Sequence, residues 1–122
     1  MQRKLLIIED DPEMGYLLGT KAARLNFLCD IDETGAEWPA LLDQGPPDAI
    51  LLDMDLPRMS GFSILRQLKA QDAYRGIPVF VWSGTSDPEV IDEAKDLGAR
   101  EYFLKSKDLN ELFREINSAL RG

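Results

Sequence analysis

Short apolar runs alternate along the chain with segments in which apolar residues recur every three or four positions. The apolar runs are the candidate strands, and they fall at residues 4–9, 27–31, 49–53, 78–83 and 101–104. Several runs are apolar at consecutive positions, which is typical of parallel strands that are covered on both faces. The alternation therefore predicts an α/β domain with a parallel sheet.

The segments between these runs carry the apolar stripes of amphipathic helices. The five stripes are Met14, Leu17, Leu18, Ala22 and Leu25; Trp38, Leu41 and Leu42; Ile64, Leu65 and Leu68; Val90, Ile91, Ala94 and Leu97; and Leu109, Leu112, Phe113, Ile116 and Leu120. Asp11-Pro12 and Asp87-Pro88 each have the order of an acidic N-cap followed by proline in the first turn. Gly98 follows the fourth stripe, where a left-handed residue commonly ends a helix.

Five strands and five helices in 122 residues fit one compact domain, residues 1–122. We expect a flavodoxin-like (βα)5 three-layer sandwich, with a parallel five-stranded sheet of order 2-1-3-4-5 and right-handed crossovers. Periodicity alone does not fix that order. In such sheets, ligands bind beyond the carboxyl ends of the strands, at the switch point between strands 1 and 3.

The composition excludes several classes of chemistry. The chain has 22 acidic and 14 basic residues, a formal net charge of −8, which argues against direct nucleic-acid binding by this domain. It has no histidine, so histidine-based zinc sites and a phosphohistidine on this chain are excluded. The single cysteine, Cys29, is expected to be a buried filler in a cytoplasmic protein. No apolar run approaches the ~20 residues that span a bilayer.

Polar side chains gather where the predicted strands end. Glu9 and Asp10 end the first strand and Asp53 ends the third, so the expected strand order brings three carboxylates together. Neighbouring carboxylates repel one another and raise one another's pKa. A divalent cation relieves that repulsion, and a few carboxylates combined with water and phosphate suit Mg²⁺ best. Lys105, after the fifth strand, supplies a further positive charge, whereas Asp11 is better explained as a helix cap.

Four segments at these strand ends resemble the motifs of response-regulator receiver domains. They are residues 7–12 (IIEDDP), 50–61 (ILLDMDLPRMSG), 78–84 (PVFVWSG) and 102–105 (YFLK). They occur in the family's order and at its spacing, and the resemblance covers essentially the whole chain. Any one of these motifs is a weak signal, whereas four in register are a strong one.

The resemblance implies a role for each matching residue. The implied Mg²⁺ ligands are Glu9, Asp10, Asp53 and the backbone carbonyl of Asp55. Asp53 is the implied phosphoacceptor, and Ser83 and Lys105 would contact the phosphoryl group. Ser83 and Tyr102 would form a switch that changes the surface made by the fourth helix, the fifth strand and the fifth helix.

The same resemblance implies the partners. The phosphoryl donor would be a phosphohistidine on a sensor histidine kinase or a histidine phosphotransfer protein, and a downstream output domain or protein would receive the signal. Such a domain is not an enzyme in the usual sense, but it promotes its own aspartyl phosphorylation and dephosphorylation. We expect a cytoplasmic monomer or weak homodimer that has no membrane contact.

Two features depart from the family or leave alternatives open. Ser106 stands where the family usually has a proline after the lysine, often with a cis peptide bond, and a cis bond before serine would cost ~3 kcal/mol. This departure favours, as one alternative, a phosphorylation-independent scaffold of the same fold. The Asp53-Met54-Asp55 sequence also resembles the motif of haloacid-dehalogenase-like phosphatases, although in those enzymes that motif normally opens the chain.

Overall fold

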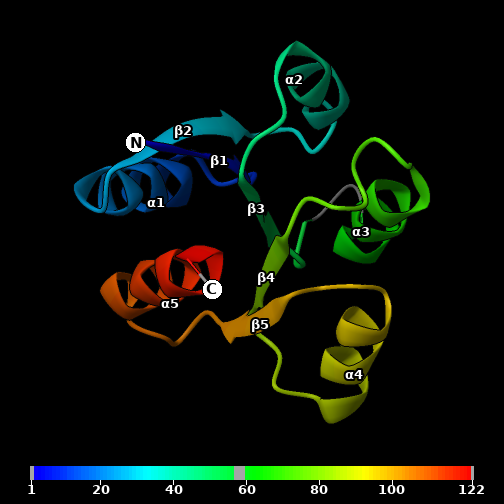
Figure 1. Ribbon diagram of the computed structural model, residues 1–122. Coiled ribbons are helices and arrows are strands. Elements are labelled where there is room, and N and C mark those ends of the chain that lie inside the picture. The colour runs from blue at the N-terminus through cyan, green and yellow to red at the C-terminus, as the bar shows by residue number, and fades with distance from the viewer. Residues whose placement is uncertain (1, 57–59, 122) are drawn as a thin grey trace.

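The computed structural model describes residues 2–56 and 60–121 (Figure 1), so residues 57–59 of the second motif lie outside the described residues. The strands are β1 (Arg3–Ile8), β2 (Phe27–Asp32), β3 (Ala49–Asp53), β4 (Val79–Ser83) and β5 (Glu101–Leu104). The helices are α1 (Pro12–Arg24), α2 (Trp38–Gln44), α3 (Gly61–Ala70), α4 (Pro88–Asp96) and α5 (Leu109–Arg121). The strands are parallel and lie in the order β2-β1-β3-β4-β5. This order and the flavodoxin-like fold confirm the prediction.

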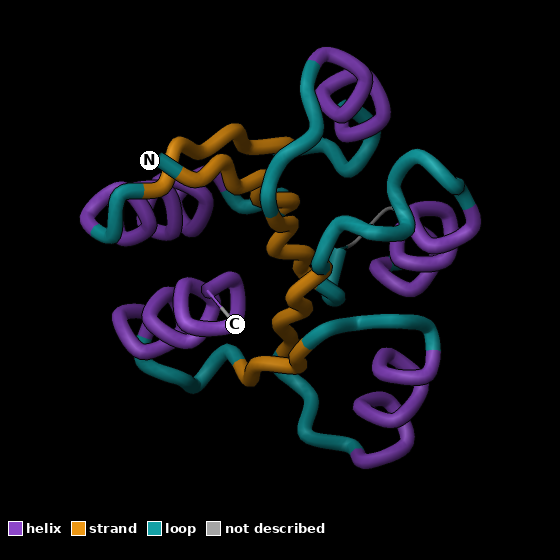
Figure 2. The backbone as a smooth tube through the Cα atoms, viewed as in Figure 1, coloured by secondary structure: helices purple, strands orange, loops and turns teal. Residues whose placement is uncertain are grey.

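The helices cover both faces of the sheet and so form the predicted three layers. Figures 1 and 2 show α1 and α5 on one face and α2, α3 and α4 on the other. Along β1, Leu5 and Ile7 belong to the core beneath α1 and α5, whereas Leu6 and Ile8 belong to the core of the other face. All four side chains are buried, which explains why this strand is apolar at consecutive positions.

The register of the sheet brings the last residues of β3, β4 and β5 to one edge. Asp53 pairs with Trp82, and Ser83 pairs with Leu104. The backbone N–H of Lys105 donates to the carbonyl of Ser83 at 2.8 Å, so the chain after β5 delivers the lysine to the same place. We call this edge, at the C-terminal ends of the strands, the carboxyl edge, and the opposite edge the amino edge.

The starts of α1 and α4 are fixed by the acidic caps that the sequence predicts. The carboxylate of Asp11 accepts a hydrogen bond from the N–H of Glu13, and that of Asp87 accepts one from the N–H of Glu89, each at 3.0 Å. Caps of this kind typically contribute about 1 kcal/mol to stability. The capping role of Asp11 supports its exclusion from the expected metal ligands.

The pattern of apolar residues did not predict two features correctly. Leu17 was expected on the buried face of α1, but it is 40% exposed, because the neighbouring Leu18 and Ala22 define the centre of that face. Asp32 is fully buried, and its carboxylate accepts hydrogen bonds from backbone N–H groups of the β2–α2 loop and from that of Trp38, the first residue of α2, at 2.8 Å. It thereby replaces the missing N-cap side chain of α2.

Cys29 was expected to be a buried filler, but the structure leaves it partly accessible. Cys29 is half-buried beside the core under α1 and α5, and burial, followed by the charge of Asp30, raises the pKa of its thiol to about 11. Such a thiol is a poor nucleophile at neutral pH.

Within residues 2–56 and 60–121, no helix has the length and apolar character needed to cross a membrane.

Candidate functional site

A cavity of about 180 Å³ opens at the carboxyl edge. Its lining consists of Glu9, Asp10, Asp11, Met14, Asp53, Asp55, Trp82 and Lys105. Among the described residues, five acidic side chains and one lysine therefore face one small space. The cavity brings Glu9, Asp10, Asp53 and Asp55 together with Lys105, although these residues come from three different strand ends.

Three of the carboxylates form a compact cluster. Glu9 and Asp53 are only 2% and 1% exposed, and Asp10 is half-buried. One oxygen from each lies within 4.8 Å of the others. Burial, followed by a hydrogen bond with Asp53 and its negative charge, raises the pKa of Glu9 to about 8. The cluster offers only hard oxygen donors and is penalised by its own charge, so its chemistry fits a divalent cation such as Mg²⁺.

Lys105 neutralises part of this charge. Its Nζ lies 3.0 Å from Oδ1 of Asp53, 3.2 Å from Oδ2 of Asp55 and 5.2 Å from the centroid of the Trp82 ring. Burial alone would lower the pKa of Lys105, but the hydrogen bonds and charges of the two aspartates outweigh it and raise the pKa above the ordinary value. The lysine is therefore a permanent cation beside Asp53 at neutral pH.

The backbone also restrains the predicted phosphoacceptor. The N–H of Asp55 donates to Oδ1 of Asp53 at 2.8 Å, the same oxygen that Lys105 contacts. In the described residues every peptide bond is trans, including the one between Lys105 and Ser106. A cis bond is therefore not needed to bring the lysine to Asp53.

Sequence reasoning missed the contacts of the Asp55 side chain, because it assigned a role to the backbone carbonyl alone. Oδ1 of Asp55 accepts a hydrogen bond from the Ser83 hydroxyl at 3.0 Å, and Oδ2 accepts one from the N–H of Gly84 at 2.8 Å. Burial would raise the pKa of Asp55, but the bonds from Gly84, Lys105 and Ser83 hold it below its usual value. An aspartate at position 55 predicts a negative charge near the site. The direction of its side chain depends on the turn after β3, which the sequence pattern does not specify.

The two predicted switch residues are linked through one residue of the β4–α4 loop. Ser83 is buried, and its Oγ accepts a hydrogen bond from the N–H of Thr85 at 3.2 Å. Tyr102 is half-buried, and its hydroxyl donates to the carbonyl of Thr85 at 2.8 Å. Ser83 and Tyr102 therefore hold the same loop residue from two sides, and their role as a switch stays a prediction.

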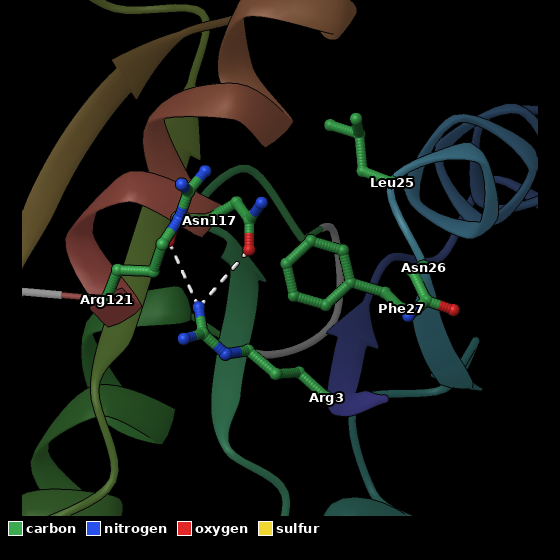
Figure 3. Close-up of a pocket in the computed structure, with 6 residues that line it drawn as sticks. All are labelled: Arg3, Leu25, Asn26, Phe27, Asn117 and Arg121. Carbon is green, nitrogen blue, oxygen red and sulfur yellow. Dashed lines mark hydrogen bonds between the residues drawn. The ribbon is translucent and has the colours of Figure 1, made fainter. Parts of the chain in front are cut away.

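A second cavity, of about 250 Å³, lies at the amino edge. Its lining consists of Arg3, Leu25, Asn26, Phe27, Asn117 and Arg121 (Figure 3). Arg3 reaches from β1 to α5, where its guanidinium donates to the backbone carbonyl of Asn117 at 3.0 Å and to the side-chain Oδ1 at 3.2 Å. This cavity contains none of the predicted site residues, and no acidic residue is among those that line it in the described part of the chain.

Comparisons with known proteins agree with the fold and the motifs. The sequence matches the response regulator receiver domain family over residues 5–117. Protein PilH of Pseudomonas aeruginosa is 33% identical over 120 residues, 98% of each chain. Sporulation initiation phosphotransferase F of Bacillus subtilis is 30% identical over 92% of this chain and 89% of that protein. The solved receiver domain of a DNA-binding response regulator from Colwellia psychrerythraea gives a TM-score of 0.90 at 27% identity, over 99% of this chain and 100% of that one.

A parallel β2-β1-β3-β4-β5 sheet with its polar cavity at the carboxyl edge defines a flavodoxin-like α/β domain of the signal-receiver class. With a family match over residues 5–117, the chain belongs to the response regulator receiver domain family. This membership disfavours the phosphatase alternative. The chain spans about half the length of some transcriptional regulators that it matches, 49% and 51% in two cases.

Proposed function

We propose that this receiver domain accepts a phosphoryl group on Asp53, in a Mg²⁺-dependent reaction, from a phosphohistidine of a sensor histidine kinase or a histidine phosphotransfer protein. The supporting observation is the placement of Asp53, a carboxylate only 1% exposed, with a lysine 3.0 Å away and two further carboxylates beside it. Burying this much charge is costly, and such arrangements are typical of functional sites. That one relative is named a phosphotransferase also supports phosphoryl transfer.

The proposed chemistry is an in-line displacement at phosphorus. An oxygen of Asp53 forms a bond to phosphorus as the phosphorus–nitrogen bond of the phosphohistidine breaks, and the imidazole leaves with the bonding electron pair. Negative charge spreads over three equatorial oxygens in the transition state. Lys105 neutralises part of that charge and the Ser83 hydroxyl donates a hydrogen bond to it.

Mg²⁺ would be held by Glu9, Asp10, Asp53 and the backbone carbonyl of Asp55, and when bound it supplies charge neutralisation to the phosphoryl oxygens. The chain's own contribution is to place Asp53 so that one oxygen is fixed by Lys105 and the N–H of Asp55. This restraint reduces the conformational freedom that the acceptor must lose in the transition state.

Phosphorylation would then be transmitted through the β4–α4 loop. The aspartyl phosphate carries about one more negative charge than the aspartate and adds acceptor oxygens, which attract the Ser83 hydroxyl. Ser83 and Tyr102 share contacts with Thr85, so a shift of Ser83 changes how the tyrosine ring is held. We propose that a cytoplasmic output domain or protein recognises the resulting surface of α4, β5 and α5.

The proposal is tested by intact mass spectrometry after incubation with acetyl phosphate and Mg²⁺. We expect one phosphoryl group on the wild-type chain, none on Asp53→Asn, and loss of the adduct when the metal is chelated. Asp92→Asn, which neutralises an exposed acid on α4, is the matched control and should be phosphorylated like the wild type. Stoichiometric phosphorylation of Asp53→Asn would place the acceptor elsewhere, and no adduct on any chain would support the scaffold alternative.

A further inference from the structure

The carboxylate of Asp55 is surrounded by hydrogen-bond donors, as a bound anion would be. Its two oxygens accept from the Ser83 hydroxyl at 3.0 Å and the Gly84 N–H at 2.8 Å, and Oδ2 lies 3.2 Å from Nζ of Lys105. A hydroxyl, a backbone N–H and an ammonium group that converge on one small space form a typical site for a carboxylate or a phosphate. The three donors come from the end of β4, the loop that follows it and the end of β5.

Two of these donors, Ser83 and Lys105, are the groups that the proposed function assigns to the phosphoryl group on Asp53. Lys105 bridges the two aspartates, with its Nζ 3.0 Å from Oδ1 of Asp53 and 3.2 Å from Oδ2 of Asp55. The carboxylate of Asp55 therefore lies next to the phosphoacceptor and is bonded to the same partners. A phosphoryl group on Asp53 would therefore need donors that are already bonded to Asp55.

We propose that the Asp55 carboxylate is an internal substitute for the phosphoryl group, which biases the switch residues toward their phosphorylated arrangement and competes with phosphorylation. The proposal rests on the proposed function and adds a regulatory role for a side chain of the same site. It makes Asp55 a positioning residue, since it acts through Ser83 and Lys105 and does not react.

The link from Asp55 to the switch follows a short chain of contacts. Asp55 draws the hydroxyl of Ser83 toward the cavity, and Oγ of Ser83 accepts from the N–H of Thr85 at 3.2 Å. The carbonyl of Thr85 in turn accepts from the hydroxyl of Tyr102 at 2.8 Å. Phosphorylation is expected to draw Ser83 further in the same direction, so Asp55 makes in part the contacts that the phosphoryl group would complete.

The competition has a simple electrostatic basis. Phosphoryl donors and phosphoryl analogues are anions, and the Asp55 carboxylate repels them while it takes up part of the charge of Lys105. Asp55→Asn removes the charge with little change in side-chain shape, and Asp55→Ala removes all the side-chain contacts. With 41% of its side chain exposed, Asp55 is not part of the core, so both variants should fold.

The first test measures the switch without metal or phosphoryl group, by NMR hydrogen exchange of the Gly84 and Thr85 amides. We expect both amides to be protected in the wild type, to exchange at least several-fold faster in Asp55→Ala, and to stay protected in the control Asp92→Asn. Equal protection in wild type and Asp55→Ala would overturn the proposal. This measurement does not depend on phosphorylation. It can therefore overturn the role of Asp55 as an internal substitute without bearing on the proposed phosphorylation of Asp53.

The second test titrates beryllofluoride with Mg²⁺ and follows the fluorescence of Trp82, whose ring lies 5.2 Å from Nζ of Lys105. Asp55→Asn should lower the half-saturating concentration about tenfold, because a like charge next to the bound anion is removed. In Asp55→Ala, beryllofluoride should restore the protection of the Thr85 amide, and the added Ser83→Ala substitution should abolish that restoration. Equal or weaker binding by Asp55→Asn would contradict the competition. No binding by any chain would count against the proposed function instead.

Discussion

The two edges of the sheet carry cavities of opposite character. The amino-edge cavity is the larger, about 250 Å³ against about 180 Å³, and it is lined by two arginines and no acid among the described residues. The carboxyl-edge cavity is lined by five acids and one lysine. At the amino edge, the guanidinium of Arg3 is hydrogen-bonded to Asn117. This contact links β1 to α5, which is a structural role.

Unbalanced buried charge, and not cavity size, distinguishes the edge that carries the candidate site from the opposite edge. Glu9 and Asp53 are buried beside each other, although burial penalises both charges and each carboxylate repels the other. Folding alone gives no reason to keep such a pair, whereas a cation and a phosphoryl group do.

Replacing Lys105 by methionine should slow phosphorylation of Asp53 by acetyl phosphate roughly 100-fold, because a charge that stabilises the transition state is lost. The rate is measured by intact mass spectrometry over time at saturating Mg²⁺. The matched control is Lys107→Met, which removes a nearby lysine whose partner, Glu115, lies on α5 and not in the cavity. Equal rates for the two variants would contradict the role of Lys105.

Without divalent metal, the acidic cluster should make stability depend on pH. The pKa of Glu9 is raised in the folded chain from 4.5 to about 8, so the folded state holds this proton more tightly than the unfolded state. The resulting stabilisation is complete below pH 4.5 and is lost as the pH rises toward 8.

Thermal unfolding of the wild type and Glu9→Gln isolates this contribution. The unfolding midpoint of the wild type should fall relative to that of Glu9→Gln as the pH rises from 5 to 8, by an amount that corresponds to at least about 1 kcal/mol. Saturating Mg²⁺ should reverse the trend for the wild type, since the cation favours the ionised cluster. If the midpoints of the two chains changed in parallel across this pH range, the pKa of Glu9 would not be raised in the folded chain.

The smallest effect is expected at the amino edge. Arg3→Ala removes the hydrogen bonds to Asn117 and should lower the free energy of unfolding by about 1 kcal/mol, as measured by urea denaturation. The same variant should retain the wild-type rate of phosphorylation and the wild-type response to Mg²⁺. A marked loss of either would mean that the amino edge takes part in the function.

The sequence predicted the fold and the residues that gather at the candidate site, because both depend on strand order. Once β1 and β3 are neighbours, Glu9 and Asp53 must lie at the same edge, and Lys105 follows from the position of β5. The contacts of the Asp55 side chain were not predicted, because they depend on the turn after β3 and not on periodicity. Asp32 was missed for a similar reason, since most of its hydrogen bonds come from backbone N–H groups of the β2–α2 loop.

The proposed binding of a divalent cation by the acidic cluster at the carboxyl edge, beside Asp53, can be measured with Mn²⁺. This ion prefers the same oxygen ligands as Mg²⁺, and as a paramagnet it broadens the NMR signals of nearby amides. We expect substoichiometric Mn²⁺ to broaden the amides of residues 9–11 and 53–55, to spare those of Arg3, Phe27 and Asn117, and to be displaced by Mg²⁺. Broadening that is uniform, absent or centred on the amino edge would mean that the acidic cluster does not bind the ion.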